Sequence, residues 1–498
     1  MNVGTIVVDR TSSAGFTHRG VKVRDLPMSE TLLHDIADYC RRAGMAESTF
    51  GRLAVNDGKL VSRLRLGGRV TTDTADRVHA FIARQPQPEV NGSAPHHSGV
   101  GRSVVNGMAM APLTTPAITA LDAPGRNFRF YDNRQKYLLF VTTCSEKWAI
   151  AQRVGMELGN IHPRPPALRL FDAGTGDGTV LTRTMRAMHH RFATMPFYIV
   201  AKEISLEDVR LTLEKMPDRL FEHPATVLVM TNMYYAEAPW LTPHSVTAAT
   251  SLLWHELPLT GNTAHDFELQ IGDLQGFLGQ HWQARVSGKS GNPVYEKPVV
   301  LVIYREDHKF LLDQVRPHRG TTRADYDLVI ASQPYRARAP VEFKARRIIA
   351  PLARSLAPGG RLIAIHSHGH DPGLEIIQQL WPGEDPFTTD RHALLRAAKA
   401  ELGSAARAFN FGAYADARSL FRYDMHTLPS EISETIGTST LFAAWNAAVY
   451  VAQIEDERLS GAISSGAYLD ATREVLRKYD GLWFWDESYV ISRKRDSG

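Results

Sequence analysis

The chain has 498 residues, of which 43% are apolar and 22% are charged, the proportions of an ordinary globular protein. Its two cysteines, Cys40 and Cys144, are too few for a disulfide scaffold and too far apart for a CxxC site, so we expect reduced, buried thiols. No apolar run approaches the ~20 residues that span a bilayer, and the first residues lack the apolar core of a signal peptide. We therefore expect a cytoplasmic protein with no membrane partner.

Charge and composition divide the chain into three parts. The net charge is +4, and the first 85 residues carry the whole of this surplus, which indicates an acidic partner for the N-terminal part alone. Residues 86–118 are rich in Pro, Gly, Ser and Asn and have no sustained period, which is typical of a flexible linker. We therefore predict a small domain over 1–85, a linker over 86–118 and a large domain over 119–498.

The N-terminal domain has the pattern of a set of short amphipathic helices. Apolar residues recur at helical spacing over 29–44, where Ser29 is the expected N-cap. Three further helices are expected over 48–55, 59–66 and 72–84. The turn Asn56-Asp57-Gly58 joins the first two of these, and a three-residue turn with glycine between two helices is the spacing of a helix-turn-helix.

This stretch resembles the lambda-repressor-like helix-turn-helix domains. In such domains the second helix of the motif enters the major groove of DNA. The resemblance implies that DNA would be contacted by Lys59, Ser62, Arg63 and Arg65. The alternative is an all-α docking or dimerisation module whose basic face is merely solvated. One short helix offers few base contacts, so real sequence specificity would require a homodimer or help from the large domain.

In the large domain, apolar runs alternate with helical patterns. Strands are expected over 167–174, 197–203, 225–232, 326–333 and 361–368. Because these runs are separated by helices of a dozen residues or more, they predict right-handed βαβ units and a parallel sheet. Two further strands are expected near the C-terminus, over 421–429 and 481–494.

An insertion over about 234–325 separates the third expected strand from the fourth. Within it, residues 297–315 are expected to form a hairpin and residues 266–282 to be helical. His255 and Glu256 lie in 254–262, which lacks the HExxH spacing of a metalloprotease and is expected to be a capped loop. The role of the insertion stays open.

Residues 170–178 read LFDAGTGDG, a glycine-rich loop behind an apolar strand. The dinucleotide fingerprint G-x-G-x-x-G fails because Thr179 or Leu181 stands where its third glycine is needed. The P-loop pattern of nucleoside triphosphatases does not match, because no Gly-Lys-Ser/Thr follows. The pattern that fits is acid-x-G-x-G-x-G, formed by Asp172, Gly174, Gly176 and Gly178.

In this loop the sequence resembles the class I, Rossmann-like methyltransferases that use S-adenosylmethionine (SAM). The resemblance implies an α/β fold with a mostly parallel sheet and an antiparallel terminal strand, beside the small all-α domain. It also implies SAM as cofactor. In that family the loop wraps the methionine part of SAM, and here those contacts would come from Asp172, Gly174, Thr175, Gly176 and Gly178.

Three other places in the large domain carry the same resemblance. Glu203 ends the second expected strand, where the family places an acid that accepts hydrogen bonds from the ribose hydroxyls of SAM. Asn232 and Met233 follow the third strand, near the place of the adenine in the family; Asn232 could instead cap a strand-end turn. The phrase SLAPGGRLIAI, residues 355–365, resembles the family's junction between a helix and its fifth strand, and the two C-terminal strands match its terminal hairpin.

After the fourth expected strand, residues 332–335 read SQPY. This stretch resembles the (Asp/Asn/Ser)-Pro-Pro-aromatic motif of methyltransferases that act on amine and amide nitrogens, with Gln333 in place of the first proline. The resemblance implies that Ser332 and the backbone carbonyl of Gln333, which precedes Pro334, accept hydrogen bonds from the target amine, while Tyr335 stacks on the substrate. The alternative is a plain strand-end turn in which Pro334 ends the strand and Tyr335 packs in the core.

Histidines and an acid alternate in HSHGHD, residues 366–371. Zinc ligands can alternate in this way, but Gly369 and Pro372 oppose a continuing strand, and no second ligand cluster is evident. We therefore expect no metal site and interpret the segment as a loop that lines the cleft.

Three functions fit these patterns. The first is a SAM-dependent methyltransferase that acts on a nitrogen of an unidentified acceptor; the balanced charge of residues 119–498 favours an acceptor other than nucleic acid. The second is a DNA-base amino-methyltransferase tethered by its helix-turn-helix. The third is a transcription regulator that senses SAM without catalysis, which the departure at Gln333 keeps open.

Overall fold

The computed structural model describes residues 28–43, 47–55, 57, 59–65, 71–84, 134–288, 292–320, 322–427, 431–432 and 435–495. The chain divides into two compact units, Met1–Ile118 and Thr119–Gly498. The predicted linker lies outside the described residues, as do Asn56 and Gly58 of the expected turn.

The N-terminal unit contains the four helices that its sequence predicts. They are α1 (Met28–Ala43), α2 (Glu47–Val55), α3 (Leu60–Arg65) and α4 (Thr72–Arg84). Their apolar faces meet in one core, where the rings of Tyr39, Phe50 and Phe81 pack edge to face. Helix α1 begins at Met28, so Ser29 lies inside the helix and is not its N-cap.

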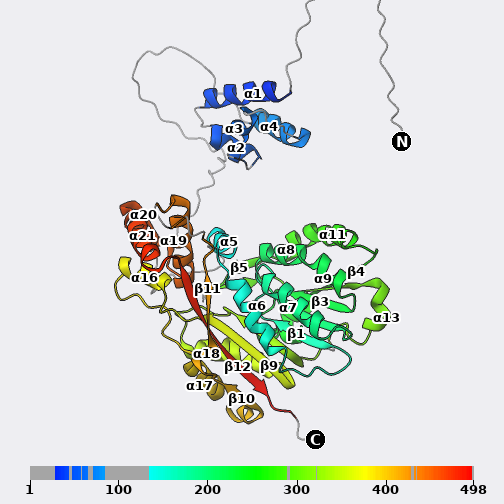
Figure 1. Ribbon diagram of the computed structural model, residues 1–498. Helices are drawn as coiled ribbons and strands as arrows, with labels where there is room; N and C mark the ends of the chain where they lie inside the picture. The colour runs from blue at the N-terminus through cyan, green and yellow to red at the C-terminus, as the bar shows by residue number, and fades with distance from the viewer. Residues whose placement is uncertain are drawn as a thin grey trace, which may run out of the picture. The chain divides into compact units, whose positions relative to one another are not determined.

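The large unit is built on one extended sheet (Figure 1). Its strands are β1 (Leu168–Asp172), β2 (Phe197–Lys202), β3 (Thr226–Thr231), β4 (Leu253–Leu259), β7 (Val299–Arg305), β8 (Tyr326–Ser332), β9 (Leu356–Ser367), β10 (Phe409–Gly412), β11 (Leu420–Asp424) and β12 (Trp483–Arg493). They lie in the order β10-β12-β9-β8-β1-β2-β3-β7-β4, and β11 also pairs with β12. Strands β5 (Ala284–Val286) and β6 (Pro293–Tyr295) form a separate antiparallel pair.

The middle of the sheet is parallel and its flanks are antiparallel. Strands β3, β2, β1, β8 and β9 run in one direction, and β12 lies antiparallel against β9. Strands β10 and β11 lie antiparallel on the other side of β12, so the predicted C-terminal pair is confirmed. The sheet is thus mostly parallel and Rossmann-like, with an antiparallel terminal strand, as the sequence predicts.

Helices cover both faces of the sheet, because successive strand side chains point to opposite faces. Leu170 packs into the core of one face and Phe171 into the core of the other. The first face is covered by α6 (Glu146–Glu157), α7 (Thr179–Arg191), α8 (Leu206–Glu214), α9 (Met216–Glu222), α11 (Ala264–Gly272) and α12 (Leu274–His281). The second is covered by the π-helical turn η4 (Ala345–Ile349), α15 (Ala350–Arg354) and α17 (Arg391–Leu402).

A third apolar core is formed mainly by helices. It is built from α5 (Arg134–Thr143), α16 (Pro372–Leu380), α19 (Thr438–Ala452), α20 (Asp456–Ser465) and α21 (Ala467–Tyr479). Tyr423 of β11 and Phe484 of β12 stack on each other inside it, which joins this core to the sheet. The remaining short elements are η2 (Ala238–Trp240), α10 (Val246–Ser251), η3 (Glu306–His308), α13 (Lys309–Leu312), α14 (Val341–Lys344), η5 (Gly403–Ala408) and α18 (Asp416–Ser419).

The insertion extends the sheet beyond β3, and two expectations for it are wrong. Residues 297–315 do not form a hairpin: β7 is followed by the helical turns η3 and α13. Residues 254–262 are not a capped loop, because most of them belong to β4, which pairs along its length with β7. Most side chains of β4 are half-buried, so its sequence lacks the continuous apolar run of a central strand.

Both cysteines are buried free thiols, as expected. Among the residues that the structure places, every helix is too short or too polar to cross a bilayer.

Candidate functional site

The order of the strands reverses at β1. From β1 the chain moves through β2 to β3 on one side, and it returns on the other side of β1 to form β8 and β9. In open α/β sheets ligands bind outside the carboxyl ends of the strands at such a reversal point. Asp172 ends β1 and Ser332 ends β8, so the two predicted site residues flank this point.

The glycine loop follows β1 directly and requires two of its glycines. Gly176 and Gly178 have φ values of +56° and +79°, a region that side chains other than glycine rarely adopt. A Cβ on Gly178 would also lie 2.8 Å from Thr212 Oγ1. The loop is anchored to the next strand because the amide of Thr175 donates to the carbonyl of Lys202 over 3.1 Å.

Asp172 is buried, and only one of its carboxyl oxygens has a partner. Its Oδ1 accepts a 3.4 Å hydrogen bond from the amide of Gly174, while Oδ2 has no partner among the described residues. Burial raises the pKa of Asp172 to about 7, and the nearby negative charge of Glu203 adds to this effect. A positively charged group at Oδ2 would reverse the shift.

Within the described part of the chain, two further buried oxygens near the reversal point have no hydrogen-bond partner. They are Thr175 Oγ1 in the loop and Ser332 Oγ at the end of β8. An unsatisfied buried polar atom costs about 1–3 kcal/mol and is rare in folded proteins. Together with Asp172 Oδ2, these atoms form a set of buried hydrogen-bonding groups that a polar ligand would satisfy.

Glu203 lies next to the loop, where the second strand ends. Its Oε2 accepts from the amide of Gly176 over 2.9 Å, and its Oε1 accepts from the amides of Ile204 and Ser205 over 2.7 and 2.9 Å. A carboxylate offers about four acceptor positions, so one remains on Oε2. Glu203 can therefore accept one further hydroxyl in this arrangement, and a second only if the loop shifts.

Asn232 and Met233 are both buried after β3. Asn232 Oδ1 accepts from the amide of Val299, and its Nδ2 donates to the carbonyl of Lys297, each over 2.9 Å. The side chain thus ties β3 to the insertion, which accounts for both of its polar groups and favours the alternative of a structural strand-end residue. Met233 belongs to an apolar core. A contact of either residue with adenine stays a prediction.

The SQPY segment turns sharply at Gln333, whose φ is +48°. The Gln333 side chain points into a polar network, where Nε2 lies 3.2 Å from Ser367 Oγ and 3.2 Å from Asp486 Oδ1. The carbonyl of Pro334 accepts a 3.0 Å hydrogen bond from the hydroxyl of Tyr235.

Tyr335 is only 8% exposed. Its hydroxyl lies 2.6 Å from His366 Nδ1 and 3.2 Å from the hydroxyl of Tyr489. His366 Nε2 is in turn 3.0 Å from Glu487 Oε2, and Arg391 pairs with the other carboxylate oxygen over 2.6 Å. These contacts favour the core alternative for Tyr335, and stacking on a substrate stays a prediction.

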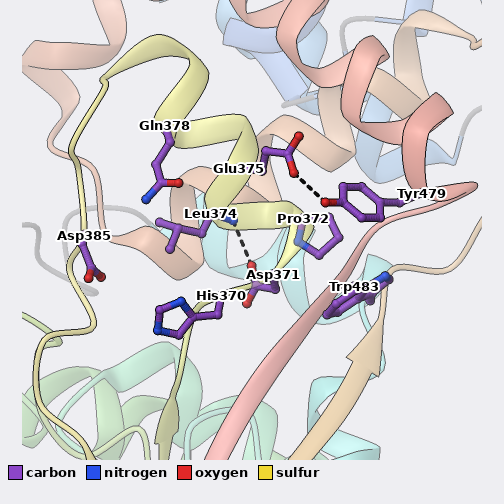
Figure 2. A pocket seen from close by; sticks show the side chains of 9 residues that line it. All are labelled: His370, Asp371, Pro372, Leu374, Glu375, Gln378, Asp385, Tyr479 and Trp483. Carbon is purple, nitrogen blue, oxygen red and sulfur yellow. Dashed lines mark hydrogen bonds between the residues drawn. The ribbon is translucent and has the colours of Figure 1, made fainter.

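The segment HSHGHD does not gather metal ligands. No group of three or more His, Cys, Asp or Glu in the described part of the chain could hold a metal ion. His366 belongs to β9, whereas Asp371 caps α16 and accepts from the amide of Leu374 over 2.9 Å. His370 and Asp371 line a cavity of about 240 Å³ together with residues of α16, Tyr479 and Trp483 (Figure 2).

The predicted DNA-contacting residues lie on or beside α3 in the N-terminal unit. Lys59, Ser62, Arg63 and Arg65 are all exposed. Two of them already have acidic partners, because Arg63 pairs with Asp57 over 2.8 Å and Arg65 pairs with Glu47 over 2.6 Å. Exposed ion pairs contribute about 0–1 kcal/mol, so a phosphate group could replace either partner at small cost.

A group of buried polar residues beside the glycine loop has no counterpart in the sequence patterns. The hydroxyl of Tyr137 accepts from the amide of Asp177 over 3.2 Å, and Lys147 lies 5.7 Å from the centre of the Tyr137 ring. Lys147 pairs with Glu146 over 3.2 Å; burial opposes its charge, but Glu146 and the other nearby acids raise the pKa of Lys147 above its usual value. These residues come from helices upstream of β1 and carry no motif, so only their closeness in the fold reveals them.

No protein-family model matches the chain, and no curated protein matches it. Among solved structures, geranyl diphosphate methyltransferase in complex with GPP and sinefungin is 12% identical, with 69% of this chain and 77% of that chain covered and a TM-score of 0.26. PKMT2 from Rickettsia typhi in complex with AdoHcy is 10% identical, covers 71% and 54%, and has a TM-score of 0.24. The rRNA methyltransferase aviRa from Streptomyces viridochromogenes is 14% identical, covers 44% and 72%, and has a TM-score of 0.16. These superpositions are too weak to assign a function. The fold assignment therefore rests on the strand order, and the candidate site rests on its own residues.

Proposed function

We propose that this chain is a SAM-dependent methyltransferase that transfers a methyl group to a nitrogen of a still unidentified acceptor. The observation that carries the proposal is the set of partnerless buried oxygens, Asp172 Oδ2, Thr175 Oγ1 and Ser332 Oγ, at the reversal point of the sheet. SAM, when bound, supplies a methyl group activated by its sulfonium, so the protein mainly has to position a nucleophile.

The residues present fit SAM. Asp172 Oδ2 would accept from the ammonium group of its methionine part, and the carboxylate of Glu203 would accept from the ribose. The Gly174–Gly178 backbone would pass close to the ligand because no side chain intervenes at its glycines.

On the acceptor side, Ser332 is the best-supported residue. Its hydroxyl is buried and has no hydrogen-bond partner among the residues that the structure describes. Ser332 would hold the acceptor nitrogen so that its lone pair faces the methyl group, with Tyr335 behind it as part of the wall.

Binding of SAM and of sinefungin, measured by calorimetry, tests the cofactor assignment. Asp172→Ala and Glu203→Ala should each weaken binding at least tenfold, the loss of one charged hydrogen bond. Asp470→Ala is the matched control because this exposed acid on α21 pairs with Arg473, outside the proposed site. Unchanged affinity in both site variants would overturn the assignment.

Incubation with methyl-labelled SAM separates the possible acceptors. Label in small amines or in protein supports the nitrogen acceptor proposed here. Label in DNA would move the proposal to a DNA-base methyltransferase. SAM binding with no label in any fraction would favour the SAM-sensing regulator.

A second proposal concerns the N-terminal unit, which we infer binds DNA through α3. It is favoured by the exposure of all four predicted contact residues around this helix. The double variant Lys59→Ala, Arg63→Ala should flatten the salt dependence of DNA binding by about two phosphate contacts. An unchanged slope would leave the docking or dimerisation alternative.

A further inference from the structure

Two buried carboxyl groups meet beside the reversal point of the sheet. Glu146 begins α6, and Asp486 lies in the middle of β12 with none of its surface exposed. The amide nitrogen of Gln333 lies between them, 3.3 Å from Glu146 Oε1 and 3.2 Å from Asp486 Oδ1. The structure therefore assembles a carboxyl pair from segments that are far apart in the sequence.

This pair has fewer hydrogen-bond donors than acceptors. The amide nitrogen of Gln333 has two hydrogens but faces three acceptors, since Ser367 Oγ also lies 3.2 Å away. Asp486 Oδ2 is buried and accepts no hydrogen bond from any residue that the structure places. A network that served only to join α6, β8, β9 and β12 would satisfy both oxygens of a buried carboxyl group.

The pair also has fewer positive charges than acids. Lys147 pairs with Glu146 over 3.2 Å. Burial and the charge of Glu146 raise the pKa of Asp486, against smaller opposing effects of Lys147 and Gln333. A cation at Oδ2 would favour the ionised carboxylate and balance the second acid.

The pair lies next to the proposed methyl-donor site. Gln333 follows Ser332, whose carbonyl oxygen is 4.0 Å from where a Cβ on Gly174 would lie. Because the side chain of Gln333 contacts Asp486, this one residue connects the carboxyl pair to the end of β8 and, through Ser332, to the glycine loop.

We propose that the Glu146–Asp486 pair binds a primary ammonium group of the methyl acceptor and takes one proton from it. The neutral amine that results has the lone pair that methyl transfer requires. This inference rests on the proposed function and narrows it, because the acceptor becomes an amine and not an amide, a carboxylate or a hydroxyl compound. An ammonium group brings three donors and one positive charge, which are what the pair lacks. Gln333 is a positioning residue, because its amide nitrogen bridges Glu146 Oε1 and Asp486 Oδ1 and leaves Asp486 Oδ2 for the ammonium group.

The test uses the full chain and three probes of similar size: propylammonium, 1-propanol and propionate. Binding of sinefungin is measured first, and each probe is then titrated into the sinefungin-saturated protein. Propylammonium should bind, while 1-propanol and propionate should bind at least tenfold more weakly. Equal binding of 1-propanol or propionate would overturn the proposal.

Single-residue variants show which carboxyl groups bind the amine. Asp486→Asn keeps the shape of the side chain and should weaken propylammonium at least tenfold while sinefungin binding is retained, which also shows that the variant is folded. Glu146→Gln should act in the same direction and serves if Asp486→Asn does not fold. Asp385→Asn is the matched control because it makes the same change in the separate cavity of about 240 Å³ (Figure 2).

Three results would contradict the inference in different ways. Loss of propylammonium binding in Asp385→Asn but not in Asp486→Asn would move the amine to the other cavity. Loss of sinefungin binding in a folded Asp486→Asn variant would assign the pair to the donor site. If the unaltered protein does not bind sinefungin, the proposed function fails, and titration of propylammonium into the ligand-free protein then tests the amine site alone.

Discussion

Replacing Asp172 by Asn should make the large unit more stable at pH 8 and weaken its binding of sinefungin. The ordinary pKa of an aspartate is 3.8, and burial raises that of Asp172 to about 7. The folded state therefore holds a proton at pH values where the unfolded chain has lost it, so stability falls as the pH rises from about 4 to about 7. At about 1.4 kcal/mol for each pKa unit, this fall is up to about 4 kcal/mol.

Urea unfolding followed by tryptophan fluorescence measures the effect. All eight tryptophans lie in residues 119–498, so the signal reports only on the large unit. At pH 4 Asp172→Asn and the unaltered protein should differ little, and at pH 8 the variant should be more stable by up to about 4 kcal/mol. Asp470→Asn, which alters an exposed acid, should leave the pH profile unchanged.

Sinefungin gives the second half of this prediction. The α-amino group of sinefungin at Asp172 would stabilise the ionised carboxylate. Saturating sinefungin should therefore remove most of the pH dependence that Asp172 causes in the unaltered protein. Asp172→Asn should bind sinefungin about 10–100-fold more weakly, the loss of a hydrogen bond to a charged group. Parallel pH profiles of the variant and the unaltered protein would refute the reasoning, because Asp172 would then carry no uncompensated buried charge.

Glu203→Ala should weaken sinefungin binding at least tenfold, because its carboxylate both anchors the glycine loop and faces the ribose; calorimetry that shows an unchanged Kd would contradict this role. Gly178→Ala should lower the free energy of unfolding by about 2–4 kcal/mol, since a side chain is strained at φ +79° and its Cβ would lie 2.9 Å from Thr212 Cα. A loss below 1 kcal/mol in urea unfolding would show that the loop relaxes. Glu487→Gln should cost about 3–5 kcal/mol at pH 7 because it leaves the buried charge of Arg391 with a weaker partner. Burial opposes its ionisation, yet hydrogen bonds from His366 and Arg391 lower the pKa of Glu487 to about 2, so this cost should shrink as the pH falls from 4.5 towards 2.

The parallel part of the fold could be predicted because its strands are buried on both faces. Strands β2 and β3 are nearly continuous apolar runs, and the start of α8 after β2 is marked by the Ser205 hydroxyl, which accepts from the amide of Asp208. Strand β4 was missed because an edge strand with half-buried side chains lacks that run. The second strand of the expected hairpin does not form, because Glu306–His308 is a helical turn directly after β7.

The candidate site divides in the same way between local and distant contacts. The glycine loop and Glu203 form one continuous stretch with β1 and β2, so spacing in the sequence predicts them. The contacts of Gln333 with Glu146 and Asp486 join residues 187 and 153 positions apart, and no local pattern encodes such pairs. Asn232 illustrates the opposite case. It stands at a motif position, yet its hydrogen bonds connect β3 to the insertion.

The place of β12 in the sheet has a consequence for how the protein is made. Strand β12 lies between β9 and the pair β10 and β11, yet the ribosome produces it only after α19, α20 and α21. Until then, a nascent chain exposes the edge of β9 and two short strands without their partner, which invites pairing with other chains. The same strand contains Asp486 and Glu487, so an incompletely synthesised copy would lack both the complete sheet and part of the proposed amine site. Chaperone binding at this edge, and aggregation of chains that end before residue 483, are therefore the characteristic hazards of this architecture.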